Sequence, residues 1–152
     1  MAIAYLSLGT NIGNKRRNMI TAAALLAERV GDVLALSGFY ETEPWGFASE
    51  NLFLNAAVKL KTSFSPSELL LATQQIEKEL GRTEKSNGAY HDRIIDIDIL
   101  LYDDEIRQTA ELTLPHPLMH DRKFVMDPLS EIAPFVVHPV LKERIIDLKE
   151  RL

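Results

Sequence analysis

The chain contains no cysteine, which excludes disulfide bonds, thiolate zinc sites and cysteine nucleophiles. It also lacks an apolar run of about 18 residues, so we expect no transmembrane helix. Met1 leads directly into a strand-like segment instead of a charged signal peptide, and we therefore expect a cytoplasmic protein. The few prolines and glycines are scattered, so neither a linker nor a low-complexity tract is indicated.

Basic residues are too few to favour nucleic-acid binding. Asp and Glu (22) outnumber Lys and Arg (17), which gives a net charge of −5. Because affinity for a phosphate backbone depends on clustered Lys and Arg, we expect no nucleic-acid partner. The sequence also offers no arrangement of the Ser/His/Asp or nucleophilic-lysine type. With 46% hydrophobic residues, the 152 residues are expected to form one globular domain, 1–152.

The periodicity of apolar residues predicts an alternation of strands and helices. Asn14 and Ser65 are expected helix caps, with Glu68 at the capping-box position after Ser65. The order strand, helix, strand, strand, helix, strand is typical of an α+β, ferredoxin-like βαββαβ sandwich, an antiparallel sheet with helices on one face. The expected strands are residues 2–8, 33–42, 52–61 and 94–102, and the expected helices are 14–30 and 65–80.

The rest of the chain predicts a small C-terminal hairpin and helix appendage. Asp103-Asp104 is expected to turn the chain into a second hairpin strand at 105–109. A short helix at 129–133 and a terminal helix at 141–152 would complete it. Because helices would cover one sheet face, the opposite face is expected to stay open for ligand.

Asp96 and Asp98 lie two residues apart in the most hydrophobic strand-like run of the chain. Alternation along a strand places both carboxylates on one face, with Cα atoms roughly 7 Å apart. Two unit charges at that separation repel by about 2 kcal/mol at an effective dielectric of about 20. A bound divalent cation would reverse this repulsion, so the pair is a candidate metal site. The opposite face carries the apolar stripe Ile95, Ile97, Ile99 and Leu101.

An exposed strand face is the alternative explanation for the two aspartates, since full hydration reduces their repulsion to under about 1 kcal/mol. Neighbouring cations favour the metal interpretation, because Arg82, Lys85 and Arg93 lie just upstream. Carboxylates for Mg²⁺ beside cations for phosphate oxygens are what phosphoryl transfer requires.

Aromatic and amide side chains indicate a pocket for a planar heterocycle. Phe53 and Asn55 would share one strand face. With Trp45 and Phe124, Phe53 would form an aromatic clamp, while Asn55 pairs with ring nitrogens and oxygen. Burial of Trp45 by its own loop is the alternative. His116, held between two prolines, is a candidate phosphate or nucleotide contact, and a histidine bonded to nearby backbone is equally compatible with the local sequence.

Several segments match the motifs of one known family over nearly the whole chain. The most specific combination is Arg93-x-x-Asp96-x-Asp98 with a later Pro-His and an Arg-x-Phe. The others are Tyr5 to Asn11, Phe39 to Thr42, Phe53 to Val58, Gln75-Ile76-Glu77 with Gly81-Arg82, and Leu114 to Pro117. In this combination the chain resembles the 6-hydroxymethyl-7,8-dihydropterin pyrophosphokinase family.

The resemblance implies a folate-pathway enzyme that transfers pyrophosphate from MgATP to the hydroxymethyl group of 6-hydroxymethyl-7,8-dihydropterin and releases AMP. It implies that Asp96 and Asp98 bind two Mg²⁺ ions and that Arg82 and Arg93 are catalytic. ATP and the pterin would be its partners, and we expect a monomer. A non-catalytic ferredoxin-like module that binds small molecules is the alternative function.

The resemblance also implies the substrate subsites, and loops 43–51 and 82–92 are expected to close over them. The implied ATP positions are Leu70, Gln74, Glu77, Lys85, Arg93, Ile99, Thr113, His116 and Arg122. The implied pterin positions are Thr42, Glu43, Pro44, Trp45, Phe53, Asn55 and Phe124. The chain departs from the family pattern at Glu84, Tyr90-His91-Asp92, Glu111 and Pro117.

Overall fold

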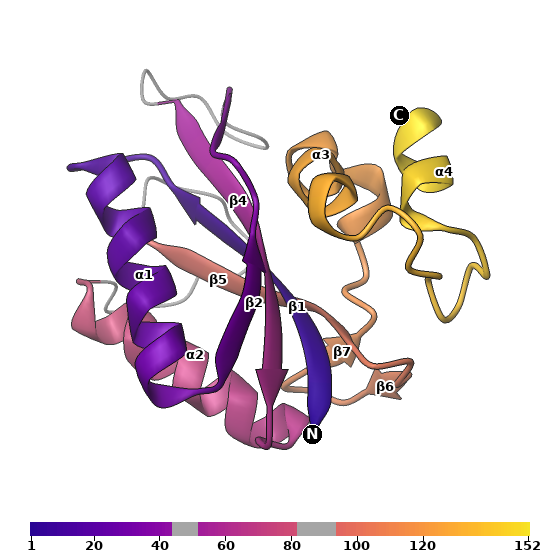
Figure 1. Cartoon of the computed structure of the whole chain (residues 1–152), viewed down its shortest axis with the longest axis horizontal. Coiled ribbons are helices and arrows are strands. Elements are labelled where there is room, and N and C mark those ends of the chain that lie inside the picture. Colours follow the sequence, from indigo (N-terminus) through magenta and orange to yellow (C-terminus); the bar gives the residue numbers. More distant parts are fainter. Residues whose placement is uncertain (44–51, 82–93) are drawn as a thin grey trace.

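The computed structural model describes residues 1–43, 52–81 and 94–152 (Figure 1). Its five-stranded antiparallel sheet has the order β2-β4-β1-β5, and β3 also pairs with β4. The strands of this sheet are β1 (Ala2–Thr10), β2 (Asp32–Leu36), β3 (Tyr40–Thr42), β4 (Phe53–Thr62) and β5 (Asp96–Tyr102). The helices are α1 (Lys15–Arg29), α2 (Pro66–Glu79), α3 (Lys123–Ile132), α4 (Ile145–Glu150) and the 3₁₀ turn η1 (Met119–Asp121).

The predicted ferredoxin-like βαββαβ order is confirmed, but the strand expected at 33–42 is divided into β2 and β3, which follow one another along β4. The division lies at Ser37. Its N–H donates to the Ala57 carbonyl at 2.9 Å, and its hydroxyl accepts from the Ala57 N–H at 2.8 Å. Because a side-chain oxygen here takes the place of a backbone acceptor, the backbone ladder stops and resumes only at Tyr40.

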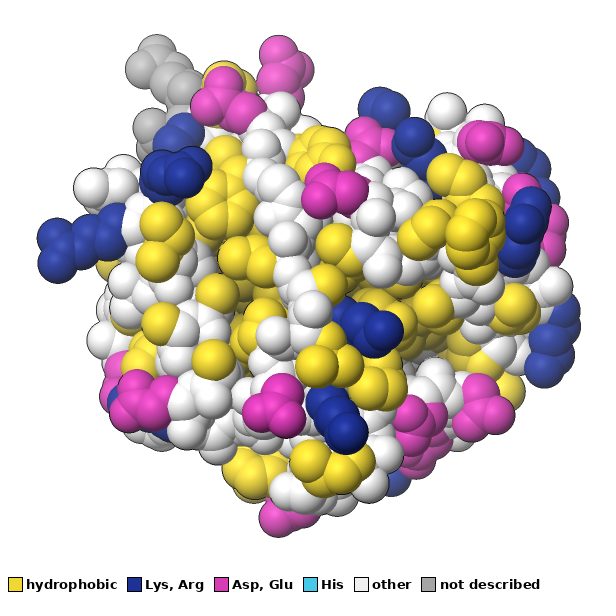
Figure 2. All heavy atoms as spheres, in the orientation of Figure 1, with side chains coloured by type: hydrophobic (Ala, Val, Ile, Leu, Met, Phe, Trp, Pro, Cys, Tyr) yellow, Lys and Arg dark blue, Asp and Glu magenta, His cyan; other side chains and the backbone are white. Residues whose placement is uncertain are grey.

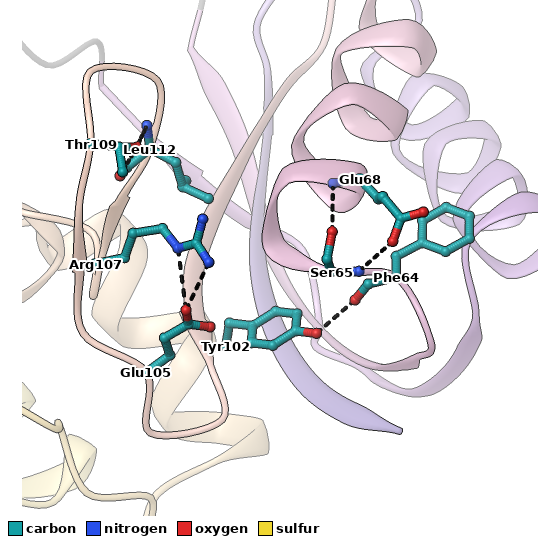
Figure 3. A network of polar contacts seen from close by, with 8 residues as sticks. All are labelled: Phe64, Ser65, Glu68, Tyr102, Glu105, Arg107, Thr109 and Leu112. Atoms are coloured by element: carbon teal, nitrogen blue, oxygen red, sulfur yellow. Dashed lines mark hydrogen bonds and ion pairs between the residues drawn. The ribbon is translucent and has the colours of Figure 1, made fainter.

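Both predicted helix caps are confirmed. Asn14 Oδ1 accepts a backbone N–H of the first turn of α1 at 3.1 Å. Ser65 and Glu68 form a reciprocal capping box at the start of α2, with bonds of 2.9 and 3.2 Å (Figure 3). Beside it, the Tyr102 hydroxyl donates to the Phe64 carbonyl at 2.6 Å. These bonds satisfy N–H groups at the helix ends and tie the end of β5 to the start of α2.

Two apolar clusters form the core, one on each face of the sheet. Helices α1 and α2 cover the first face, as predicted, whereas α3 and α4 lie on the opposite side (Figure 1). The first cluster includes Leu6, Leu8, Met19, Leu26, Ala56, Val58, Leu60, Leu69, Ile76, Ile95, Ile97 and Ile99. The second includes Tyr5, Ala57, Leu100, Leu101, Met119, Val125, Met126 and Leu129.

Leu101 lies on the face opposite to the predicted one. The pairing of β1 with β5 changes register, because Leu6 pairs with Ile99 whereas Tyr5 pairs with Leu101. Leu100 is thus the extra residue of a β-bulge. Leu100 and Leu101 both join the second cluster, while Ile99 stays in the first. The alternation expected from the sequence therefore holds up to Ile99 and fails after it.

The C-terminal segment is larger than the expected appendage and covers part of the second sheet face. Helix α3 begins at Lys123, whereas the sequence predicted a helix only at 129–133. Pro128 lies inside α3, where a proline removes one backbone hydrogen bond. Burial of Val125, Met126 and Leu129 against the sheet outweighs this loss. The face expected to stay open is consequently open only beyond α3.

The predicted turn at Asp103-Asp104 is present, with Asp103 in the left-handed region (φ 48°). The prediction that the next strand forms a hairpin at this turn is wrong, however. β6 (Arg107–Gln108) pairs with β7 (Thr113–Leu114) in a separate two-stranded sheet and not with β5. An ion pair of Arg107 with Glu105 at 2.9 Å accompanies this short hairpin (Figure 3).

The terminal helix is shorter than the predicted 141–152. Lys142 has a left-handed backbone (φ 59°), and Val137 forms an isolated bridge with Arg144. The residues before Ile145 therefore form a turn, and α4 begins only at Ile145. A left-handed residue cannot continue a right-handed helix, which explains the late start.

Acidic and basic side chains are interspersed over the face shown in Figure 2, with no large patch of one sign. Among the helices of the described ranges, none has the length and apolar character needed to cross a bilayer.

We expect the turn before α4 to make the stability of the protein sensitive to acid. His138 is 3% exposed, and its Nδ1 accepts from the N–H groups of Val140 (3.2 Å) and Leu141 (3.0 Å). Burial, and secondarily the neighbouring His120, lowers the pKa of His138 below its ordinary value of 6.5. As the pH falls, His138 therefore becomes protonated in the unfolded chain at a higher pH than in the folded chain, and protonation favours unfolding. We expect the free energy of unfolding to fall between about pH 7 and pH 5, by at most about 1.4 kcal/mol per pH unit from this group.

Urea unfolding at several pH values measures this effect. His138→Asn removes the titrating group while its side-chain oxygen can still accept a backbone N–H, so the variant should have a flatter pH dependence than the wild type. Identical pH dependence in the two proteins would contradict the assignment.

Candidate active site

The strand register places the two aspartates beside small residues of the central strand. On β1, Gly9 lies opposite Asp96 of β5 and opposite Asn55 of β4. Two residues earlier, Ser7 lies opposite Asp98 on one side and Ala57 on the other. Directly opposed side chains on one sheet face have Cβ atoms about 5 Å apart. Two rows therefore run across the sheet, each with a carboxylate at one end and a small residue at its centre.

These rows form the floor of a cleft of about 480 Å³ on the sheet face that α3 leaves open. Because Gly9 lacks a side chain, the middle of the floor stays clear; a Cβ there would lie 3.5 Å from Asn55 Oδ1. The cleft is lined by Ser7, Gly9, Thr42, Glu43, Phe53, Asn55, Asp96, Asp98, Arg122 and Phe124.

Asn55 is 2% exposed and is held from one side. Its side-chain nitrogen donates to Thr42 Oγ1 at 2.7 Å and to the Tyr40 carbonyl at 3.3 Å. Within the described part of the chain, no residue donates to its Oδ1. The two bonds fix the plane of the amide. β3 thus provides the partners that a buried amide requires.

Arg122 and Phe124 reach the cleft from the segment that leads from η1 into α3. Arg122 is 6% exposed, and its Cζ lies 5.7 Å from the centroid of the Phe124 ring. Burial lowers the pKa of the Arg122 guanidinium, which nevertheless stays charged at neutral pH because arginine starts from a very high value. The described lining of the cleft thus combines three carboxylates (Glu43, Asp96 and Asp98), the Arg122 cation and two phenylalanine rings.

A second cavity adjoins the first, and Asp98 lines both. Four of the predicted nucleotide positions line it together, namely Leu70, Ile99, Thr113 and His116. His116 Nδ1 accepts from the Leu118 N–H at 3.3 Å, as the backbone-bonded alternative expected. The other described lining residues are Ile97, Ala110, Glu111, Leu112 and Pro117.

The remaining predicted positions fall elsewhere. Glu77 is 3% exposed, and its Oε2 accepts from the Ile97 N–H at 2.8 Å, on the backbone between the two aspartates. Neither Glu77 nor the half-buried Gln74 belongs to the described lining of the two cavities, and Arg122 lines the first cavity instead of the second. Pro44, Trp45, Arg82, Lys85 and Arg93, and nearly all of the two loops expected to close, lie outside the described residues.

Sequence reasoning missed Ser7 and Gly9 as residues of the cleft floor. Ser7 resembles the other residues of the expected strand, and Gly9 was expected just beyond its end at residue 8, whereas β1 continues to Thr10. Only the register of β1 against β4 and β5 places them between the aspartates and Asn55. Since register depends on long-range pairing, no signal within β1 itself would have revealed them.

The donor set fits Mg²⁺ better than a metal held entirely by protein. Among residues 1–43, 52–81 and 94–152, no group of three or more His, Asp or Glu side chains could hold a metal ion. Asp96 and Asp98 supply two carboxylates on one face of one strand. Mg²⁺ is commonly bound by one or two carboxylates, with water and substrate phosphates completing its six ligands. The pair therefore fits an ion that arrives with a phosphorylated substrate.

Comparison with known proteins identifies the family. The family model described as 7,8-dihydro-6-hydroxymethylpterin-pyrophosphokinase (HPPK) matches residues 5–134. The 2-amino-4-hydroxy-6-hydroxymethyldihydropteridine pyrophosphokinase of Porphyromonas gingivalis is 55% identical over 141 residues, covering 91% of this chain and 95% of its own. The Aquifex aeolicus protein of the same name is 42% identical over 149 residues, covering 98% of this chain and 91% of its own.

A solved structure extends the comparison to the fold. The HPPK-DHPS protein of Plasmodium falciparum with pteroate superposes with a TM-score of 0.80 at 19% identity. The match covers 99% of this chain and 42% of that longer chain. The sequence matches and the fold agree, and the chain belongs to the 7,8-dihydro-6-hydroxymethylpterin-pyrophosphokinase family.

Proposed function

We propose that the first cavity binds 6-hydroxymethyl-7,8-dihydropterin, that the second binds ATP, and that pyrophosphate passes between them beside Asp96 and Asp98. As a member of its family, the chain is an ATP-dependent pyrophosphokinase of folate biosynthesis, with ATP and the pterin as substrates and Mg²⁺ as the metal. The observation that carries the proposal is the position of Asp98, which lines both cavities. A group transferred from one bound molecule to another must cross such a junction.

The pterin assignment rests on the chemistry of the cleft walls. A pterin is a flat bicycle with an amide-like edge, and Phe53 and Phe124 offer aromatic surface for its faces. Asn55, held by Thr42, offers its Oδ1 to the ring edge. We include Glu43, which lines the cleft, and propose from the family resemblance that Pro44 and Trp45 also contact the pterin.

The nucleotide assignment rests on the mixed lining of the second cavity. Leu70 and Ile99 give apolar contact for a base, while Thr113 and His116 give polar groups for its edge or for the ribose and phosphates. We propose that Gln74 and Glu77 support this site from α2, and that Arg122 faces the phosphates from the cleft. Arg82, Lys85 and Arg93 would supply further positive charge.

We propose that Asp96 and Asp98 hold two Mg²⁺ ions together with ATP. Bound Mg²⁺ would neutralise phosphate charge and remove the repulsion between the two carboxylates. The strand fixes both carboxylates before substrate arrives, so positioning is achieved without reorganisation. The pterin hydroxymethyl oxygen would attack the β-phosphorus of ATP, and AMP would leave.

The alternative, a non-catalytic module that binds small molecules, would need Phe53 and Asn55 but would have no use for two carboxylates at a junction with a second cavity. We further propose that residues 1–152 act as one domain. A monomeric state and a cytoplasmic location remain predictions.

Asp98→Asn tests the metal role, because it keeps the shape of the side chain and removes its charge. We expect Mg²⁺-dependent formation of AMP from ATP and pterin to fall by at least about 100-fold, since positioned charge of this kind supplies several kcal/mol to the transition state. The circular dichroism spectrum should be unchanged. The matched control is Asp104→Asn, at an exposed aspartate just beyond the same strand, which should keep wild-type activity. Near-normal turnover in Asp98→Asn would refute the metal assignment.

Asn55→Ala tests the pterin pocket. We expect the KM for pterin to rise about 10-fold or more, because a buried polar contact to the ring edge is lost, while the KM for ATP changes less than about 2-fold. Asn14→Ala, which removes a helix cap outside the cleft, controls for lost stability at a cost of about 1 kcal/mol. Equal increases in both KM values for Asn55→Ala would place this residue outside the pterin pocket.

A further inference from the structure

We infer that Glu131 is a positioning residue for the pterin cleft, acting through Tyr40 and β3. The inference rests on the proposed assignment of this cleft to the pterin. Neither Glu131 nor the Tyr40 side chain lines the cleft. Both would act by fixing the wall that carries Thr42.

Glu131, near the end of α3, contacts Gly38, in the segment that joins β2 to β3, and Tyr40, the first residue of β3. Its Oε1 accepts from the Tyr40 hydroxyl at 2.6 Å, and its two oxygens lie 3.2 and 3.1 Å from the Gly38 N–H. Hydrogen bonds to a charged acceptor are shorter and stronger than neutral ones. The hydrogen bond that the Tyr40 hydroxyl donates to Glu131, together with burial, raises the pKa of Tyr40 to about 12.

β3 needs such an anchor because it is only three residues long and, among the described strands, pairs only with β4. Within this short pairing Tyr40 lies opposite Asn55, and Thr42 lies opposite Phe53. Tyr40 and Thr42 also accept the two bonds of the Asn55 amide. A displacement of β3 would therefore turn the amide that faces the cleft.

The same helix carries the opposite wall. Phe124 lies in the first turn of α3 and Arg122 just before it, and both line the cleft. Glu131 lies about two turns further along α3 and holds β3. Because α3 is fixed by burial of Met126 and Leu129, Glu131 sets the distance between the Phe124 wall and the Thr42 wall.

The contacts of Glu131 are exposed to solvent, so they add little to global stability. Their loss should appear in the geometry of the cleft and in pterin binding, while unfolding changes little. This separates positioning from a general structural role.

The test compares Tyr40→Phe, Glu131→Ala, Glu131→Gln and the double variant Tyr40→Phe/Glu131→Ala. We expect Tyr40→Phe and Glu131→Ala to raise the KM for pterin roughly 3- to 10-fold, with kcat and the KM for ATP within about 2-fold of wild type. The double variant should be no worse than Glu131→Ala, because both changes break one linkage. Glu131→Gln keeps an acceptor oxygen, so its KM for pterin should rise less than that of Glu131→Ala.

The matched control is Glu143→Gln, which breaks the exposed ion pair of Glu143 with Arg151 in the turn and helix after α3. It should leave both KM values at the wild-type level. A spectroscopic titration of the phenol, taken as the difference from Tyr40→Phe, should show the Tyr40 pKa falling from about 12 toward 10 in Glu131→Ala.

Unchanged pterin KM in Glu131→Ala, or parallel increases in both KM values, would overturn the inference. The proposed function is judged separately, on the wild-type enzyme, by whether it forms AMP only with pterin present. The phenol titration reports on the Tyr40–Glu131 bond in either case.

Discussion

Two like charges, Asp96 and Asp98, are held side by side on one face of β5. Their backbones pair with Gly9 and Ser7 of β1, and the buried Glu77 accepts the N–H of the residue between them. The strand cannot twist to separate the carboxylates without breaking these bonds. The fold thus holds two like charges together, and a bound cation would remove their repulsion, which is about 2 kcal/mol at an effective dielectric of about 20. The arrangement of the other site residues follows from this constraint.

The sheet brings the two substrate sites together around that pair. β1, at the centre, contributes small residues that keep the floor clear, and Asn55 faces the carboxylates from β4. Helices α1 and α2 cover the first face, so the cleft with both aspartates opens on the second. The second cavity lies beside β5 and also takes lining residues from the first face, namely Leu70, Ile97 and Ile99. On the second face, α3 covers one end of the sheet with apolar side chains and carries Phe124 to the cleft edge. Helix α3 therefore contributes both to the packing of the core and to the lining of the cleft.

Local patterns predicted what depends on local physics. The caps at Asn14 and Ser65 and the alternation that places Asp96 and Asp98 together follow from neighbouring residues, and the structure agrees. The β-bulge at Leu100 and the extent of α3 depend on contacts between distant segments, and there the predictions failed. The pairing of β6 with β7 was also missed, although these two strands are close in sequence. The floor residue Ser7 was missed because its role is defined by its partners across two strands.

The central claim is that the two carboxylates on β5 form the metal site at the junction of the two substrates. Its most direct test is a crystal structure of the chain with Mg²⁺, a non-hydrolysable ATP analogue and 6-hydroxymethyl-7,8-dihydropterin. The account predicts Mg²⁺ ligated by both Asp96 and Asp98, with the nucleotide phosphates on one side and the pterin hydroxymethyl group on the other. Metal held by other residues, with both carboxylates turned to solvent, would contradict it.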